Sequence, residues 1–278
     1  MLTIAPEADL AAEARRHDPD RWLCALFVSA EHRDACMALL LLNHELARIP
    51  DVVIQPPAGL IRCQWWRDAI IEAAAGQPRA QPIIRALAVP LAECRLDPAE
   101  LLAMIDAREH DLDHLAPEDP AALECYAAAT AGTLQACTAR LLGADAQEIE
   151  TVRTLGAAFG LIGIVRATAS LARRGRSLLP ASLTSAVGVE PGAVLTPENR
   201  QAIGGALRSI TERAMALLDR PQPSLRRQVI AAALPAVLAR DYARRIAEAG
   251  FDPLAAASLT RSPLIPIRLW WTYRRARR

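Results

Sequence analysis

The chain has 278 residues, of which 52% are hydrophobic and 23% are charged, and its formal net charge is +1. These values are typical of a folded globular protein and exclude an intrinsically disordered chain. A net charge this close to zero also argues against nucleic acid as a partner. All the basic residues other than histidine are arginines, so catalysis through a lysine Schiff base is excluded.

Helix start signals recur along the chain, because a proline directly follows a capping residue at Asp18-Pro19, Asp97-Pro98, Asp119-Pro120 and Thr196-Pro197. No segment shows the sustained alternation of a β-strand. We therefore predict an all-α fold and a single domain over residues 1–278. The expected helices are 20–48, 59–75, 79–89, 98–115, 120–142, 146–172, 197–218, 224–249 and 263–275, with a short one near 182–187.

The six cysteines form no C-x-x-C pair and lie in apolar, helical contexts, which predicts buried free thiols in a reducing compartment. Residues 1–20 are too acidic and polar for a signal peptide. The longest uncharged apolar run, 154–165, is shorter than the roughly 20 residues of a membrane span. We therefore expect a cytoplasmic protein.

Three stretches carry a recognisable order and spacing. They are Met37–Val53 followed by Ile61–Ile70, Leu101–Asp113 leading into Leu123–Gly143, and Gly156–Pro180. Together they resemble the squalene/phytoene synthase family, and the resemblance extends over about residues 20–250. It implies an isoprenoid-synthase-like helical bundle around a central cavity.

In active members of that family, two aspartate-rich motifs face each other across the cavity. Their carboxylates hold the Mg²⁺ ions that neutralise the departing diphosphate of a prenyl substrate. Aspartates at positions i and i+4 lie on one helix face, where they can share a metal ion.

The first motif, of the form Asp-Asp-x-x-Asp, falls on a segment of this chain that keeps only its last carboxylate, Asp51. Ala47 and Arg48 replace the first two aspartates. Arg48 is expected to put a positive charge where a metal ion would lie, and Pro50 is expected to end or bend the helix.

The second motif, of the form Asp-x-x-Glu-Asp, normally follows an arginine, which is Arg166 here. Its three carboxylate positions are Ala167, Ser170 and Leu171, and the asparagine that usually precedes the arginine is replaced by Gly163. Four of the five motif carboxylates are therefore absent. We expect no catalytic residue, no bound metal and no cofactor.

The positions at which this chain differs from the active members of the family resemble one particular branch of that family. They combine Asn43, Glu45 and Ala47 with Gln64–Trp66 and a C-terminal Ser262–Arg275 segment. This combination is similar to one branch of the family, which contains a mitochondrial complex I assembly factor and its bacterial relatives. The resemblance implies a non-catalytic protein whose partners are subunits or assembly intermediates of respiratory complex I (NADH:ubiquinone oxidoreductase). It also implies a peripheral position on the inner face of the inner membrane, the matrix side in a eukaryote.

The resemblance also supplies candidate residues for the cavity wall or for ligand binding. They are Asn43, Glu45, Trp65, Asp106, Glu109, Asp111, Tyr126 and Arg166. His110 and His114 have the i, i+4 spacing of transition-metal ligands, but no H-E-x-x-H pattern accompanies them, and we interpret this helix as a polar face.

Two further sequence features have ordinary packing explanations. Gly156, Gly160 and Gly163 have the wrong spacing for a dinucleotide loop and no preceding strand, so we expect them to allow close helix contact. Trp65 and Trp66 are adjacent on a helix and cannot face the same way. We expect one in the core and the other nearer the cavity.

Residues 261–278 form a basic, Trp-rich C-terminal helix with six arginines and no acidic residue. Aromatic side chains beside arginines suit a membrane surface, and the candidate residues are Trp270, Trp271, Tyr273, Arg274 and Arg275. A docked helix with a solvated basic end explains the pattern equally well.

Two other functions stay open. One is a prenyl-diphosphate transferase in which Asp51, Asp106, Glu109 and Asp111 rebuild a weaker Mg²⁺ site. The other is a protein that binds an isoprenoid or other lipid in the apolar cavity without metal ions.

Overall fold

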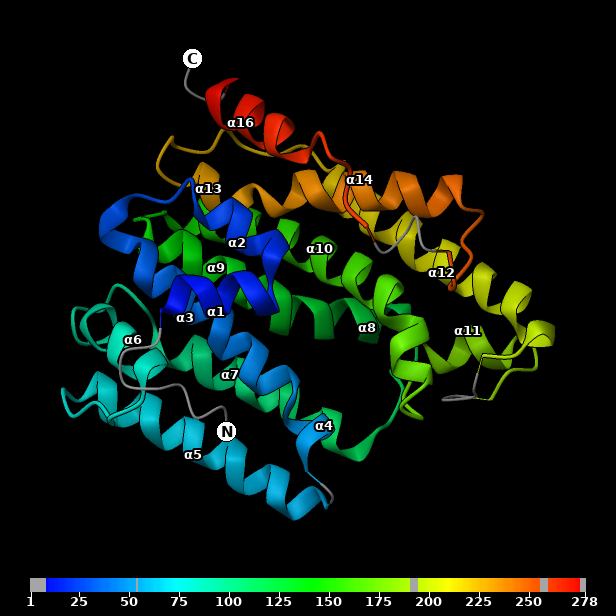
Figure 1. Ribbon diagram of the computed structural model, residues 1–278, viewed down its shortest axis with the longest axis horizontal. Helices are drawn as coiled ribbons and strands as arrows, with labels where there is room; N and C mark the ends of the chain where they lie inside the picture. Colours follow the sequence, from blue (N-terminus) through cyan, green and yellow to red (C-terminus); the bar gives the residue numbers. More distant parts are fainter. Residues whose placement is uncertain (1–8, 54, 191–194, 256–259, 276–278) are drawn as a thin grey trace.

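The computed structural model describes residues 9–53, 55–190, 195–255 and 260–275, and every regular element within them is a helix (Figure 1). The predicted all-α fold is therefore confirmed. The helices are α1 (Leu10–His17), α2 (Pro19–Ala25), α3 (Ala30–Ala47), α4 (Ile49–Val52), α5 (Pro56–Ala74), α6 (Pro82–Ala92), α7 (Pro98–Glu109), η1 (His110–Asp113), α8 (Pro120–Ala127), η2 (Ala128–Gly132), α9 (Thr133–Leu141), α10 (Ala146–Ala172), α11 (Ala181–Ser185), α12 (Pro197–Leu218), α13 (Ile230–Ala233), α14 (Pro235–Glu248) and α16 (Ile265–Arg275). The last three residues of the basic tail lie outside the described residues.

Helix α10 lies at the centre of the bundle. It packs against α8, η2 and α9, and also against α12 and α14 (Figure 1). Its first turns contribute Ile149 and Val152 to a buried cluster that also contains side chains of α3, α5, α6 and α7. The rest of its length joins a second buried cluster with α12, α14 and α16. Both parts of the core therefore depend on this one helix.

By length and composition, α10 is the one helix in the described part of the chain that could cross a membrane. However, 67% of its most apolar window is buried inside the protein. A helix enclosed by other helices is apolar on all sides for the same reason that a membrane span is. Its central position therefore accounts for its composition.

The bounds of α10 and α12 agree with the predicted helices 146–172 and 197–218. Each begins with a capping box, in which the side chain before the helix and the third helical residue satisfy each other's backbone N–H groups. Asp145 and Glu148 form this box for α10, and Thr196 and Asn199 form it for α12.

Other predicted bounds are wrong. The expected helix 20–48 is two helices, because α2 ends at Ala25 and α3 begins at Ala30. The expected helix 224–249 begins only at Ile230. Helix α1 was not predicted at all, although the Asp9 carboxylate caps it by accepting hydrogen bonds from the first backbone N–H groups.

Four of the six cysteines are buried free thiols, as predicted, namely Cys24, Cys36, Cys63 and Cys137. The prediction is wrong for Cys94 and Cys125, which are exposed. Cys94 lies in the turn after α6 with φ at 55°, and Cys125 lies on the outer side of α8.

Candidate functional site

The two altered motifs face a common cavity of about 370 Å³. Ala47 at the end of α3 and Asp51 in α4 line one side of it, four residues apart. Ala167 and Leu171 of α10 line the other side, again four residues apart. The helix geometry that would direct motif carboxylates toward one another is therefore retained, and three of these four positions hold an aliphatic side chain.

Helix α3 ends at Ala47 and α4 begins just before Pro50, so the expected break at this proline is confirmed. Arg48 does not take the position of a metal ion, contrary to our expectation. Its side chain lies in a separate pocket, where Nη1 is 3.5 Å from Oε1 of Glu45. Ser170 of α10 also lies outside the residues that line the cavity.

The remaining motif carboxylate, Asp51, is engaged by two arginines from the segment after α10. Arg174 Nη1 donates to Asp51 Oδ2 at 2.6 Å, and Arg176 Nη1 donates to Oδ1 at 3.0 Å. Each carboxylate oxygen therefore already has a cationic donor. A Mg²⁺ ion would need to displace these arginines and would then have a single carboxylate from the two motifs.

A second polar cluster joins three of the predicted residues. Tyr126 donates from its hydroxyl to Asp111 Oδ2 at 2.9 Å. Arg108 donates to the Tyr126 hydroxyl at 2.7 Å and to Asn43 Oδ1 at 3.3 Å. Burial raises the pKa of Tyr126 well above its ordinary value, so the hydroxyl keeps its proton and remains a donor. Asp111 is thus held by protein donors, like Asp51.

The cavity wall also contains residues that the sequence did not indicate. Helices α1 and α2 bring His17, Asp18 and Arg21 to it. Arg21 Nε donates to Asp18 Oδ2 at 2.6 Å, and the His17 ring stacks on the His44 ring with centroids 4.1 Å apart. Burial, with a contribution from the neighbouring His17, lowers the pKa of His44, so this histidine is a neutral group at neutral pH.

Two predicted acidic residues lie outside the cavity. Asp106 and Glu109 point from α7 toward α5 and both accept hydrogen bonds from Arg67, with Arg67 Nη2 to Asp106 Oδ1 at 2.5 Å. They line a separate pocket with His110. The four carboxylates proposed for a rebuilt Mg²⁺ site are therefore divided between two places, which removes the geometric basis for that alternative.

The predicted placement of Glu45 and Trp65 is also corrected. Both line a pocket of about 290 Å³ between α3, α4 and α5. Trp66 is buried in the core, as expected for one of the two tryptophans, and packs edge-on against Trp65.

Arg166 is likewise not among the residues that line the cavity. Its Nη1 is 3.3 Å from Oδ2 of Asp20, and its guanidinium lies 3.6 Å from the centroid of the Tyr242 ring. It therefore links α10 to α2 and α14.

Within the described residues, no group of three or more His, Cys, Asp and Glu side chains is arranged to hold a metal ion. The ring of His110 contacts the Asp106 backbone carbonyl at 2.9 Å, a local contact across the junction of α7 and η1.

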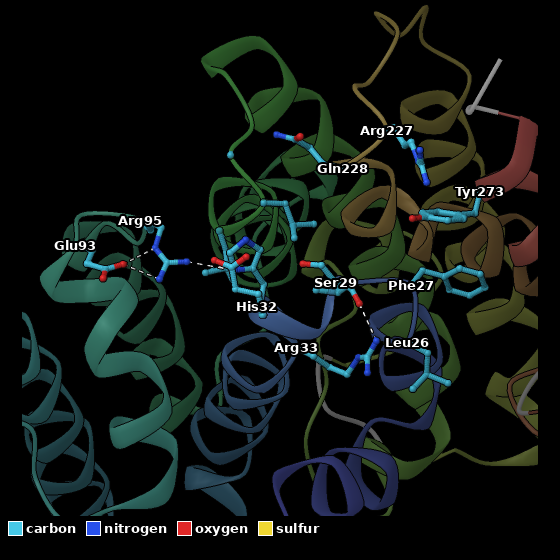
Figure 2. A pocket seen from close by; sticks show the side chains of 15 residues that line it. Leu26, Phe27, Ser29, His32, Arg33, Glu93, Arg95, Arg227, Gln228 and Tyr273 are labelled. Atoms are coloured by element: carbon cyan, nitrogen blue, oxygen red, sulfur yellow. Dashed lines mark hydrogen bonds and ion pairs between the residues drawn. The ribbon is translucent and has the colours of Figure 1, made fainter.

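A hollow larger than this cavity lies elsewhere, a surface groove of about 1070 Å³ (Figure 2). It lies between the α2–α3 turn, the end of α9 and α16, and neither motif contributes to it. Figure 2 shows that Arg95 in this groove lies between Glu93 and His32, with which it makes contacts of 2.8 and 3.2 Å.

A helical bundle with two motif helices facing one cavity defines the isoprenoid-synthase class of fold. Residues 14–271 match the family model described as squalene/phytoene synthase, and the chain belongs to this family. A dehydrosqualene synthase crystal structure has a TM-score of 0.76 at 16% identity, covering 96% of this chain and 94% of that one. A squalene synthase from Alicyclobacillus acidocaldarius has a TM-score of 0.68 at 16% identity, covering 88% and 94%. These two structures support the fold alone.

The curated relatives carry a different name. Proteins named NADH dehydrogenase (ubiquinone) complex I, assembly factor 6, from Bos taurus and Mus musculus are 28% and 29% identical to this chain over 261 residues. Each alignment covers 92% of this chain and 78% of the relative. The resemblance drawn from the sequence, to the family and to this branch, is confirmed.

Proposed function

We propose that this protein is a non-catalytic member of the squalene/phytoene synthase family that assists the assembly of respiratory complex I. The relatives named as complex I assembly factor support the biological role. Its partners are subunits or assembly intermediates of complex I, and its place is peripheral, on the inner face of the inner membrane or on the matrix side in a eukaryote.

The observation that carries the non-catalytic part is the state of Asp51. It is the one carboxylate left in the two motifs, and Arg174 and Arg176 each occupy one of its oxygens. The facing positions on α10, Ala167 and Leu171, have no oxygen ligand to offer. Ionisation of a prenyl diphosphate needs several bound metal ions, and each carboxylate of the cavity wall, namely Asp18, Asp51 and Asp111, already accepts a hydrogen bond from an arginine or a tyrosine.

We expect the purified protein to form no product from farnesyl or geranylgeranyl diphosphate with Mg²⁺, under conditions in which an active synthase of the family turns over. Addition of Mg²⁺ should leave the melting temperature of the protein unchanged, because no group of three or more His, Cys, Asp and Glu side chains in the described part of the chain is arranged to hold a metal ion. Product that is lost in Asp51→Ala would contradict the proposal and establish an enzyme with an unfamiliar metal site.

The cavity itself favours a second candidate function. It retains about 370 Å³ and apolar wall residues such as Phe159, Ile164 and Leu178, so an isoprenoid chain has a place to bind without metal ions. The melting temperature measured with farnesyl diphosphate alone separates ligand binding from a role in assembly only. A melting temperature raised by farnesyl diphosphate in the absence of Mg²⁺ indicates ligand binding, whereas no change leaves the assembly role alone.

The assembly role is tested in the organism that carries the gene. Deletion should reduce the amount of assembled complex I, measured as NADH dehydrogenase activity in native gels. Both the wild-type gene and the Asp51→Ala variant should restore it, since Asp51 has no catalytic task. Normal complex I in the deletion strain would refute this role.

A further inference from the structure

Helix α16 uses a narrow stripe to attach to the body of the protein. Ile265 and Leu269 are buried, and Tyr273 is partly buried, at a spacing of four residues. The Tyr273 ring lies 5.1 Å from the Phe27 ring, and Figure 2 shows the two side by side at the edge of the groove. Arg268 adds an ion pair of 2.8 Å with the buried Asp241. These contacts hold the helix in place from one side.

The other side of α16 is apolar and exposed. With 100° between successive residues, Ile267 and Trp271 lie opposite the buried stripe and Trp270 lies beside them. Their exposed fractions are 55%, 52% and 45%. Leu264, directly before the helix, is also 55% exposed. Docking onto the body therefore does not explain why these positions are apolar.

Positive charge accompanies this apolar face. The guanidinium of Arg274 lies 4.9 Å from the Trp270 ring centroid, and that of Arg275 lies 5.3 Å from the Trp271 ring centroid. Neither arginine makes an ion pair with a carboxylate within the described residues. Tryptophan favours the headgroup level of a bilayer, and arginines at that level attract anionic phospholipids.

We infer that the outer face of α16 is the surface by which this protein binds an anionic phospholipid bilayer. The helix lies in the plane of the membrane with Ile267, Trp270 and Trp271 among the headgroups, and Arg274 and Arg275 contact lipid phosphates. The inference deepens the proposed function and rests on it, because it gives the peripheral membrane position a definite surface. A bilayer fits this face better than a protein partner because the face combines exposed tryptophans with two arginines that make no ion pair with a carboxylate of the described residues.

The test is co-sedimentation of the purified full chain with two kinds of vesicle. One kind is phosphatidylcholine alone, and the other is equal parts phosphatidylcholine and phosphatidylglycerol. The wild-type protein should bind the anionic vesicles and bind the neutral ones much more weakly. The double variant W270A/W271A should bind anionic vesicles about tenfold more weakly. R274Q/R275Q should lose a similar factor on anionic vesicles and little on neutral ones.

A matched control is L60A/I61A, which removes two other exposed apolar side chains, 43% and 71% exposed, from α5. It should bind vesicles like the wild type. Circular dichroism should show all variants folded, since every substituted side chain is exposed. Equal binding of wild type and W270A/W271A, equal binding to both kinds of vesicle, or no binding at all would overturn the inference. None of these outcomes depends on complex I, so failure here is distinct from failure of the assembly role.

Discussion

Replacing Asp20 by alanine should lower the free energy of unfolding by about 3–5 kcal/mol, the cost typical of removing one partner from a buried charge cluster. Asp20 is 8% exposed. Its Oδ2 accepts a hydrogen bond of 2.8 Å from the Tyr242 hydroxyl and lies 3.3 Å from Arg166, while its Oδ1 lies 3.3 Å from Arg261. One carboxylate thus joins α2 to α10, to α14 and to the segment before α16.

The measurement is urea denaturation followed by circular dichroism. A matched control is Asp219→Ala, because Asp219 also pairs with an arginine, Arg240, but its side chain is 61% exposed. Exposed ion pairs contribute about 0–1 kcal/mol, so this variant should be close to wild type. If the two aspartates cost the same, the cluster around Asp20 is not a structural centre of the bundle.

The contact with Asp20 explains why Arg166 lies away from the cavity wall in which its sequence position predicts it. The sequence identified Arg166 as the arginine before the second motif, and it was expected in the cavity wall with the motif. Residues of α10 that line the cavity include Gly160, Gly163, Ala167 and Leu171, which recur every three or four positions. Arg166 follows Gly163 by three positions, so this spacing does not exclude it from the cavity, but its side chain contacts Asp20 of α2 and Tyr242 of α14 instead. Its partner is 146 residues away in the chain, a distance that no local pattern encodes.

For helix α3 too, the sequence does not indicate which side chains face the cavity. Its residues from 35 to 43 are all buried, so no polar side marks which face meets the cavity. Asn43, His44 and Ala47 line the cavity. Glu45, the residue after His44, lines a different pocket. Asn43, Ala47 and Asp51 follow one another at intervals of four residues and all line the cavity, whereas Glu45 lies outside this spacing.

Helix ends could be predicted where a local signal exists. Thr196-Pro197 predicts the start of α12, and the structure shows that α10 and α12 both begin with a capping box. The break between α2 and α3 lies in an apolar stretch without glycine or proline, and α1 begins with a capping aspartate that no proline follows. From the sequence alone, the break between α2 and α3 looks like continuous helix, and the segment of α1 looks like a loop. The single-domain organisation stays a prediction.

The three glycines of α10 were expected to share one role, and the structure divides them. A Cβ atom on Gly156 would lie 2.8 Å from the Ala131 carbonyl oxygen, and one on Gly160 would lie 2.7 Å from the Ala131 Cβ. The predicted close contact between helices is therefore confirmed at these two positions. It is wrong at Gly163, where a Cβ would meet nothing within 4 Å because the position opens on the cavity.

This difference predicts that a glycine-to-alanine substitution changes the free energy of unfolding in opposite directions at the two kinds of position. Gly156→Ala should lower the free energy of unfolding by about 1–3 kcal/mol, because α10 must move away from the backbone of η2. Gly163→Ala should raise it by up to about 1 kcal/mol, because alanine has the better helix propensity and space for its methyl group is available. Urea denaturation of both variants beside the wild type gives the comparison. A loss of stability in Gly163→Ala as large as that in Gly156→Ala would mean that the cavity wall at α10 is closed by packing, and the volume facing the two motifs would then be too small for an isoprenoid chain.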